Sequence, residues 1–173
     1  VVGDDGSGAG TKDVIERMAR ISPAKIVHVW QEDKGFRLAR IRNKAVLASM
    51  GEYIIQIDGD IIAHHRFVED HLRYARPGCY LRGGRVMLDK ALSDEACRSR
   101  KLPFIRLWSR GIEKKRWNTL RMAWLGDYMA DRYHKKSYVL GCNMSFFRSD
   151  FFAVNGYDEF FEGWGCEDSD FFR

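Results

Sequence analysis

The sequence lacks the features that mark several special classes of protein. Its four cysteines include no CxxC pair, so neither a zinc site nor a disulfide framework is expected. It contains no internal repeat, no low-complexity tract and no apolar run of about 18 residues that could span a membrane. A hydrophobic content of 45% over 173 residues is typical of a globular domain with a real core. We therefore expect a globular protein with reduced thiols, as in the cytoplasm.

The charge balance is basic. The formal net charge of +5 favours an anionic partner, which leaves nucleic acid, phosphorylated small molecules and anionic lipid surfaces open. Charge alone does not choose among these. The sequence contains no nucleic-acid-binding motif, and its acidic clusters would repel a phosphate backbone. We therefore expect no nucleic-acid partner.

Strand and helix patterns alternate along the first part of the chain. Expected strands cover Val1–Val2, Lys25–Trp30 and Glu52–Ile57, and expected helices cover residues 11–20 and 37–49. This order predicts an α/β fold with a mostly parallel sheet flanked by helices. Later expected elements are a helix at 67–76, a strand at 79–87, a strand at 137–147 and a helix at 148–154. We expect one domain over residues 1–173.

Acidic residues follow two of these strands. Asp4 and Asp5 come after the first, and Asp58 and Asp60, separated by Gly59, come after the third. Ligands bind outside the carboxyl ends of strands in such sheets. Two hard carboxylates suit Mg²⁺ or Mn²⁺ and leave coordination positions for phosphate oxygens. The alternative is that both acidic pairs only form turns or cap the next helix.

Several sequence motifs, taken in order, resemble a known enzyme family. DDGS, QEDKGFRLARIRN and YIIQIDGD resemble the nucleotide-binding half of family 2 glycosyltransferases, which have the Rossmann-like GT-A fold. The tail LGCNMSFFRSDFFAVNGYDEFFEGWGCEDSDFF resembles β-1,4-galactosyltransferases and bacterial chondroitin polymerases. The resemblance covers most of the chain except about residues 90–135. It implies a nucleotide-sugar-binding half at 1–90, an acceptor-binding and catalytic half at 91–173, and a domain that is incomplete at both ends.

The resemblance also implies roles on the donor side. Asp58 and Asp60 would hold Mn²⁺ or Mg²⁺ on the diphosphate of a UDP-sugar, and a further metal ligand would lie beyond Arg173. The implied nucleotide-binding residues are Asp4, Asp5, Gln31, Phe36, Arg37, Arg42, Asp58 and Gly59. From the residues themselves, Phe36 can stack on a base, and Arg37 or Arg42 can meet a phosphate or uracil oxygen. The alternative is that Phe36 lies in the core and the arginines line a solvated helix face.

The catalytic base is expected in the tail. By the resemblance it is Asp168, which would take the proton of the acceptor hydroxyl. Gly163, Trp164 and Gly165 would form a loop that folds over the donor, and Glu167 would bind a sugar hydroxyl. Asp170 competes for the role of base. The alternative is that these acids only favour the N-terminus of a helix.

Residues 98–124 are rich in arginine, lysine and tryptophan. They could dock on an anionic membrane surface, bind an anionic glycan acceptor, or form solvated helices whose tryptophans are core.

The sequence as a whole predicts an inverting glycosyltransferase that moves a hexose or N-acetylhexosamine from a UDP-sugar to a glycan or glycolipid acceptor. The expected setting is bacterial polysaccharide or lipopolysaccharide biosynthesis in the cytoplasm, at the inner face of the membrane. A retaining transferase and a non-catalytic sugar-nucleotide- or glycan-binding module remain alternatives.

Overall fold

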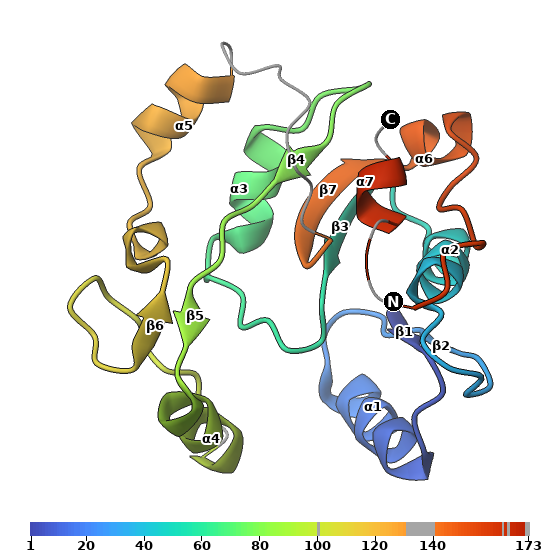
Figure 1. Ribbon diagram of the computed structural model, residues 1–173, viewed down its shortest axis with the longest axis horizontal. Coiled ribbons are helices and arrows are strands. Elements are labelled where there is room, and N and C mark those ends of the chain that lie inside the picture. Colours follow the sequence, from blue (N-terminus) through green and yellow to red (C-terminus); the bar gives the residue numbers. More distant parts are fainter. Residues whose placement is uncertain (100, 131–140, 164, 166, 172–173) are drawn as a thin grey trace. The chain divides into compact units, whose positions relative to one another are not determined.

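The chain forms two compact units whose sequences are interleaved. The computed structural model (Figure 1) describes residues 1–99, 101–130, 141–163, 165 and 167–171. Unit 1 consists of Val1–Ile54, Arg76–Tyr80 and Phe146–Arg173, and unit 2 consists of Ile55–Ala75 and Leu81–Ser145. Each unit is therefore built from segments that are distant in the sequence.

Unit 1 contains a short parallel sheet. Strand β1 (Val2–Asp4) pairs in parallel with β2 (His28–Trp30), and helix α1 (Ala9–Ile21) connects them. Helix α2 (Leu38–Ala48) packs closely against β1. The approach is so close that a Cβ atom added to Gly3 would lie only 3.2 Å from the side chain of Ile41. The buried face of α2 consists of Ala39, Ile41, Arg42 and Val46. This parallel pair and its two helices confirm the alternation that the sequence predicted.

An aromatic cluster holds the C-terminal part of unit 1. Phe146 and Phe151 are buried, and Phe151 belongs to helix α6 (Arg148–Ala153). Phe171, in helix α7 (Glu167–Phe171), stacks on Tyr157 with ring centroids 4.3 Å apart and lies 5.2 Å from the ring of Phe146. Burying aromatic side chains is among the largest stabilising contributions in a core. The cluster therefore fixes α7 to the rest of unit 1.

The remaining strands pair differently from the prediction. The strand β3 (Tyr53–Ile57) belongs to a three-stranded sheet of order β3-β7-β4, where β7 is Asn143–Phe147 and β4 is Leu81–Arg82. The β4–β7 pair is antiparallel, and so is the pair of β5 (Met87–Leu88) with β6 (Ile112–Lys114). A mostly parallel sheet is therefore not what the described residues form. The apolar pattern of Glu52–Ile57 indicated burial, and burial does not specify the partner strand.

The four expected helices are present, as α1, α2, α3 (Phe67–Arg73) and α6. Unit 2 also contains α4 (Lys90–Ser99), the 3-10 helix η1 (Arg116–Thr119) and α5 (Ala123–Ala130), whose bounds were not predicted from the sequence. The strand expected at 79–87 is two short strands, β4 and β5, and β6 was not predicted. The start of the strand expected at 137–147 lies outside the described residues. Among the helices that the structure describes, none has both the length and the apolar character needed to cross a membrane.

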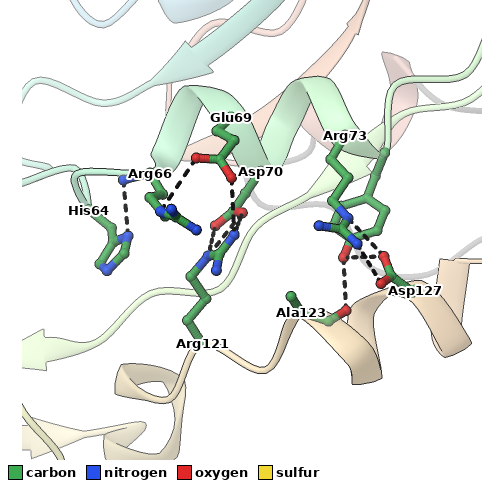
Figure 2. Close-up of polar contacts among 9 residues, drawn as sticks. His64, Arg66, Glu69, Asp70, Arg73, Arg121, Ala123 and Asp127 are labelled. Carbon is green, nitrogen blue, oxygen red and sulfur yellow. Dashed lines mark hydrogen bonds and ion pairs between the residues drawn. The ribbon is translucent and has the colours of Figure 1, made fainter.

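Charged side chains join α3 to the segment before and within α5 (Figure 2). The Arg121 guanidinium donates to both carboxylate oxygens of Asp70, at 2.6–3.0 Å, and lowers the pKa of Asp70. Arg73 donates to Asp127 at 2.6 and 2.9 Å, and the Tyr74 hydroxyl donates to the Ala123 carbonyl at 3.1 Å. These two groups of contacts hold residues 121–127 along α3.

A buried histidine connects α3 to β7. The ring of His71 contacts Ser145 Oγ through Nδ1 at 2.6 Å and Asn143 Oδ1 through Nε2 at 3.0 Å. An amide oxygen only accepts, so Nε2 carries the proton and Nδ1 accepts from the Ser145 hydroxyl. Burial lowers the pKa of His71, although Asn143 and Asp70 act in the opposite direction. The ring is therefore neutral in the folded protein at neutral pH.

This histidine should make unit 2 less stable in mild acid. The pKa of His71 is lower in the folded than in the unfolded chain, where it is about 6.5, so the unfolded chain binds more protons as the pH falls below about 6.5. At about pH 7.5, His71→Leu should cost about 1–3 kcal/mol, because it removes a partner of Asn143 and Ser145. The difference in unfolding free energy between the parent and this variant should shrink as the pH is lowered towards about 5.5. Urea unfolding followed by circular dichroism measures it. A difference that is independent of pH would contradict a neutral, buried His71.

Candidate functional site

Two carboxylates at the end of β1 are held by hydrogen bonds within unit 1. Asp4 is buried, and it accepts from the Ser7 N–H at 2.8 Å and from His28 Nε2 at 2.9 Å. Burial alone would raise the pKa of Asp4, but these hydrogen bonds hold it below its usual value. Both oxygens of Asp4 thus accept hydrogen bonds from the chain itself, and Asp4 joins β1 to β2.

Asp5 joins three parts of unit 1. Its carboxylate accepts from Gln31 Nε2 at 2.5 Å and from the Arg37 N–H at 2.6 Å. Gln31 follows β2 and Arg37 precedes the first residue of α2. These contacts bring together the ends of β1 and β2, whereas β3 belongs to another sheet.

Two buried polar atoms next to Asp5 have no hydrogen-bond partner among the described residues. They are Gln31 Oε1, an acceptor, and Arg37 Nε, a donor. An unsatisfied buried polar group costs about 1–3 kcal/mol, so such atoms are uncommon in a folded core. Another nitrogen of Arg37, Nη2, donates to the Glu32 carbonyl. The two atoms are suited to a ligand that offers both a donor and an acceptor.

Phe36 lies beside this cluster in the sequence and is 47% exposed. The alternative interpretation of Phe36 as a core contact is therefore wrong. An exposed ring can stack on a planar ligand. The backbone carbonyl of Phe36 also accepts a hydrogen bond from the Gly163 N–H at 2.9 Å, so the loop of the tail is attached to the Gln31–Arg37 segment.

Arg42 contacts the acidic pair of α7. Its Nη1 donates to Glu167 Oε1 at 3.1 Å and to Asp168 Oδ1 at 2.6 Å, and its guanidinium lies 5.6 Å from the centre of the Tyr157 ring. The side chains of Arg42 and Glu167 are each only 8% exposed. A solvated helix face is therefore the wrong interpretation for Arg42 and also for Arg37, which is buried. No sequence signal indicated this ion pair, because its members are about 125 positions apart.

The neighbouring Asn43 braces the tail. Its side-chain amide donates to the Tyr157 carbonyl at 2.9 Å, and its oxygen accepts from the Tyr157 N–H at 2.9 Å. Asp170 does not share the position of Asp168: it lines a hollow with Asn43, residues 154–159 and Phe171. Residues two positions apart on a helix point about 200° apart, which accounts for the different surroundings of the two acids.

The glycines of the tail loop have backbone conformations that other residues rarely adopt. Gly163 has φ of +91° and Gly165 has φ of +106°, and no atom lies within 4 Å of a Cβ placed on either. A side chain would be strained there by the backbone rather than by a neighbour. Trp164, which was expected to pack on sugar, lies outside the described residues.

The acidic motif after β3 belongs to unit 2. Asp58 is half-buried and Asp60 is exposed, and the Ile61 N–H donates to the Asp58 carbonyl at 3.3 Å across a turn that contains Gly59. In the described part of the chain, no three His, Cys, Asp or Glu side chains are grouped so that they could hold a metal ion. Two hard carboxylates fit Mg²⁺ or Mn²⁺ only if a phosphate-bearing ligand and water supply the other positions. The metal clamp stays a prediction.

Comparison with known proteins points to sugar transfer. Residues 122–173 match a family described as the N-terminal domain of galactosyltransferase. Two curated relatives are a validoxylamine A glucosyltransferase of Streptomyces hygroscopicus subsp. jinggangensis and one of subsp. limoneus. Each is 27% identical over 97% of this chain, which spans only 41% and 38% of their lengths. The similarity of the tail to galactosyltransferases is thus supported, whereas family 2 and the chondroitin polymerases stay predictions.

The buried ion pair predicts a large difference between two arginines of α2. Arg42→Met leaves the buried carboxylate of Glu167 without its cation, and should cost about 3–5 kcal/mol of unfolding free energy. Arg40→Met is the matched control, because Arg40 lies 3.6 Å from Glu159 and both side chains are about half exposed. That change should cost less than about 1 kcal/mol. Urea unfolding of the two variants makes the comparison, and equal losses would contradict a stabilising role of Arg42.

Proposed function

We propose that this chain is part of a glycosyltransferase that moves a hexose or N-acetylhexosamine from a UDP-sugar to a glycan or glycolipid acceptor, with inversion at the anomeric carbon. The observation that carries the proposal is the position of α2. The residue at its start binds Asp5 beside two unpartnered polar atoms, and Arg42, one turn and a half further on, binds the acidic pair of α7. One helix thus connects a candidate nucleotide cradle with a candidate base, and the similarity to sugar transferases supports sugar transfer as the activity.

The transfer step that we propose is a single displacement. The acceptor hydroxyl oxygen forms a bond to the anomeric carbon while the bond from that carbon to the diphosphate breaks. Asp168 takes the hydroxyl proton, and the electron pair leaves with UDP. The contact with Arg42 holds the Asp168 carboxylate in place. Glu167, held by the same guanidinium, would orient a sugar hydroxyl.

The donor side uses the residues around Asp5. Gln31 and Arg37 present an unpartnered acceptor and donor, which suit the imide N–H and a carbonyl of uracil, and Phe36 is exposed for stacking. Asp4 and Asp5 would hold this cradle in shape rather than contact the uracil ring, because their oxygens already accept hydrogen bonds from the chain itself. Asp58 and Asp60, with Gly59 between them, would hold Mn²⁺ or Mg²⁺. Such an ion would neutralise charge on the leaving diphosphate.

Two alternatives remain within this proposal. A retaining transferase would give a product with the anomeric configuration of the donor, whereas an inverting one would give the opposite configuration, so the configuration of the product separates the two. A non-catalytic sugar-nucleotide- or glycan-binding module would bind UDP without turnover. A cytoplasmic enzyme of bacterial polysaccharide or lipopolysaccharide assembly is the setting we propose for the inverting activity.

Calorimetric titration with UDP tests the donor site and the metal clamp separately. In the presence of Mn²⁺ we expect binding that EDTA weakens at least about tenfold, since the ion bridges carboxylates and phosphates. Asp58→Ala should abolish the effect of Mn²⁺ while leaving metal-free binding, and Gln31→Ala should weaken both. Glu32→Ala, an exposed neighbour, is the control. A Mn²⁺ effect that survives in Asp58→Ala would rule out the clamp.

Substitution of the proposed base tests the chemical step. Asp168→Asn keeps the size of the side chain and an oxygen that can accept from Arg42, and should lower UDP-sugar turnover by about 10²–10⁴-fold, because an amide cannot take the hydroxyl proton. UDP affinity should stay nearly unchanged. Asp170→Asn is the matched control on the same helix and should keep turnover within a few-fold of the parent. If Asp170→Asn is the inactive variant, the base has been assigned to the wrong acid.

A further inference from the structure

The segment 98–124, which we call the basic aromatic segment, has a charge unlike that of the rest of the chain. It contains nine Lys or Arg residues and one acidic residue, Glu113, whereas the whole chain has a net charge of only +5. The rest of the chain therefore carries a net negative charge. An anionic partner would be attracted to this segment in particular.

Most of the large apolar side chains of the segment face solvent, whereas Ile112 is buried. Trp108, Trp117 and Trp124 are 84%, 73% and 70% exposed, and Leu102 and Phe104 are 78% and 74% exposed. The alternative that the tryptophans form a core is therefore wrong. Exposed groups of this size and number mark an interaction surface rather than ordinary surface variation.

The segment is held in place by two of its arginines. Arg116 donates to the carbonyls of Leu107, Ser109 and Ile112, at 2.7, 2.8 and 3.2 Å, and so closes the chain around β6. Arg121 is paired with Asp70 of α3 (Figure 2). These two cations therefore serve the fold of unit 2.

Other cations of the segment remain available to a partner. Lys101, Arg110 and Lys115 are exposed, and in the described part of the chain the structure gives them no carboxylate partner. They are distributed among the exposed tryptophans in the sequence. The surface thus combines indole rings, aliphatic groups and cations that nothing in the described chain neutralises.

We propose that the basic aromatic segment docks on an anionic lipid surface. Tryptophan rings prefer the headgroup zone, and each Lys or Arg near an anionic membrane contributes about 1 kcal/mol of attraction. The exposed aliphatic side chains of Leu102, Leu120 and Met122 favour lipid over an anionic glycan or nucleic acid, because these polymers offer no hydrocarbon to bury them in. This inference goes beyond the proposed transferase and does not depend on it.

Vesicle binding tests the proposal. The chain is mixed with vesicles of phosphatidylcholine, with or without about one part in four of phosphatidylglycerol, and bound protein is measured by co-sedimentation. We expect binding only to the anionic vesicles, weakened by salt. The variant Lys101→Gln, Arg110→Gln, Lys115→Asn should lower the partition coefficient by about a hundredfold. Asparagine is used at Lys115 because φ there is +59°, a conformation that Asn tolerates.

Matched variants separate this surface from general charge attraction. A control variant removes the same charge from three exposed residues of unit 1, by Arg17→Gln, Arg20→Gln and Lys25→Gln together. It should bind the vesicles within a few-fold of the parent. A triple tryptophan variant combines Trp108→Ala, Trp117→Ala and Trp124→Ala, and should weaken vesicle binding at high salt. The change Phe160→Ala, at an exposed ring of unit 1, should not weaken it.

Three results would overturn the proposal. The first is an equal loss of vesicle binding in the two triple charge variants. The second is unchanged vesicle binding in the triple tryptophan variant. The third is binding of the chain to heparin or polyphosphate without binding to the vesicles. Circular dichroism of each variant confirms that the loss of binding is not a loss of folding.

Discussion

The buried ion pair between Arg42 and the acids of α7 is the interaction on which the candidate site depends. Removing a guanidinium and a carboxylate from water is costly, and the cost is offset only when the charges meet closely and keep further hydrogen bonds. Here Arg42 serves two carboxylates and lies over the ring of Tyr157. The pair therefore fixes the positions of Glu167 and Asp168 at a site where water is partly excluded.

The rest of unit 1 positions this pair. Helix α2 packs on β1 through Ile41, begins next to Asp5 and presents Arg42 on its buried face. The arginine lies five residues beyond Arg37, which corresponds to about 7.5 Å along a helix axis. From the other side, stacking of Phe171 on Tyr157 anchors α7, and Asn43 binds the backbone of Tyr157. A rigid helix and an aromatic cluster thus hold the proposed cradle and the proposed base at a set separation.

Unit 2 uses charge in a different way. Arg121 and Arg73 pair with acids of their own unit that are partly exposed, and such contacts position a segment rather than supply much stability. Their effect is to hold a strongly basic segment in place while its tryptophans stay in solvent. The two units therefore differ in chemistry: paired buried charges in one, and unneutralised exposed charges with apolar rings in the other.

The sequence by itself determined the local elements and the chemical types present. Apolar patterns located β1, α1, α2 and β3, and the roles of the acids at strand ends and in the tail stay predictions. Only the tertiary structure decided which strands pair, because an apolar strand fits many partners, so β3 joined β7 and β4 instead of a mostly parallel sheet. It also decided that Arg42 meets Glu167 and Asp168, and that Asp170 lines a hollow instead. Within the described residues, it left one side-chain atom of Gln31 and one of Arg37 without a hydrogen-bond partner. These facts depend on contacts between residues far apart in the chain, and no local pattern encodes such contacts.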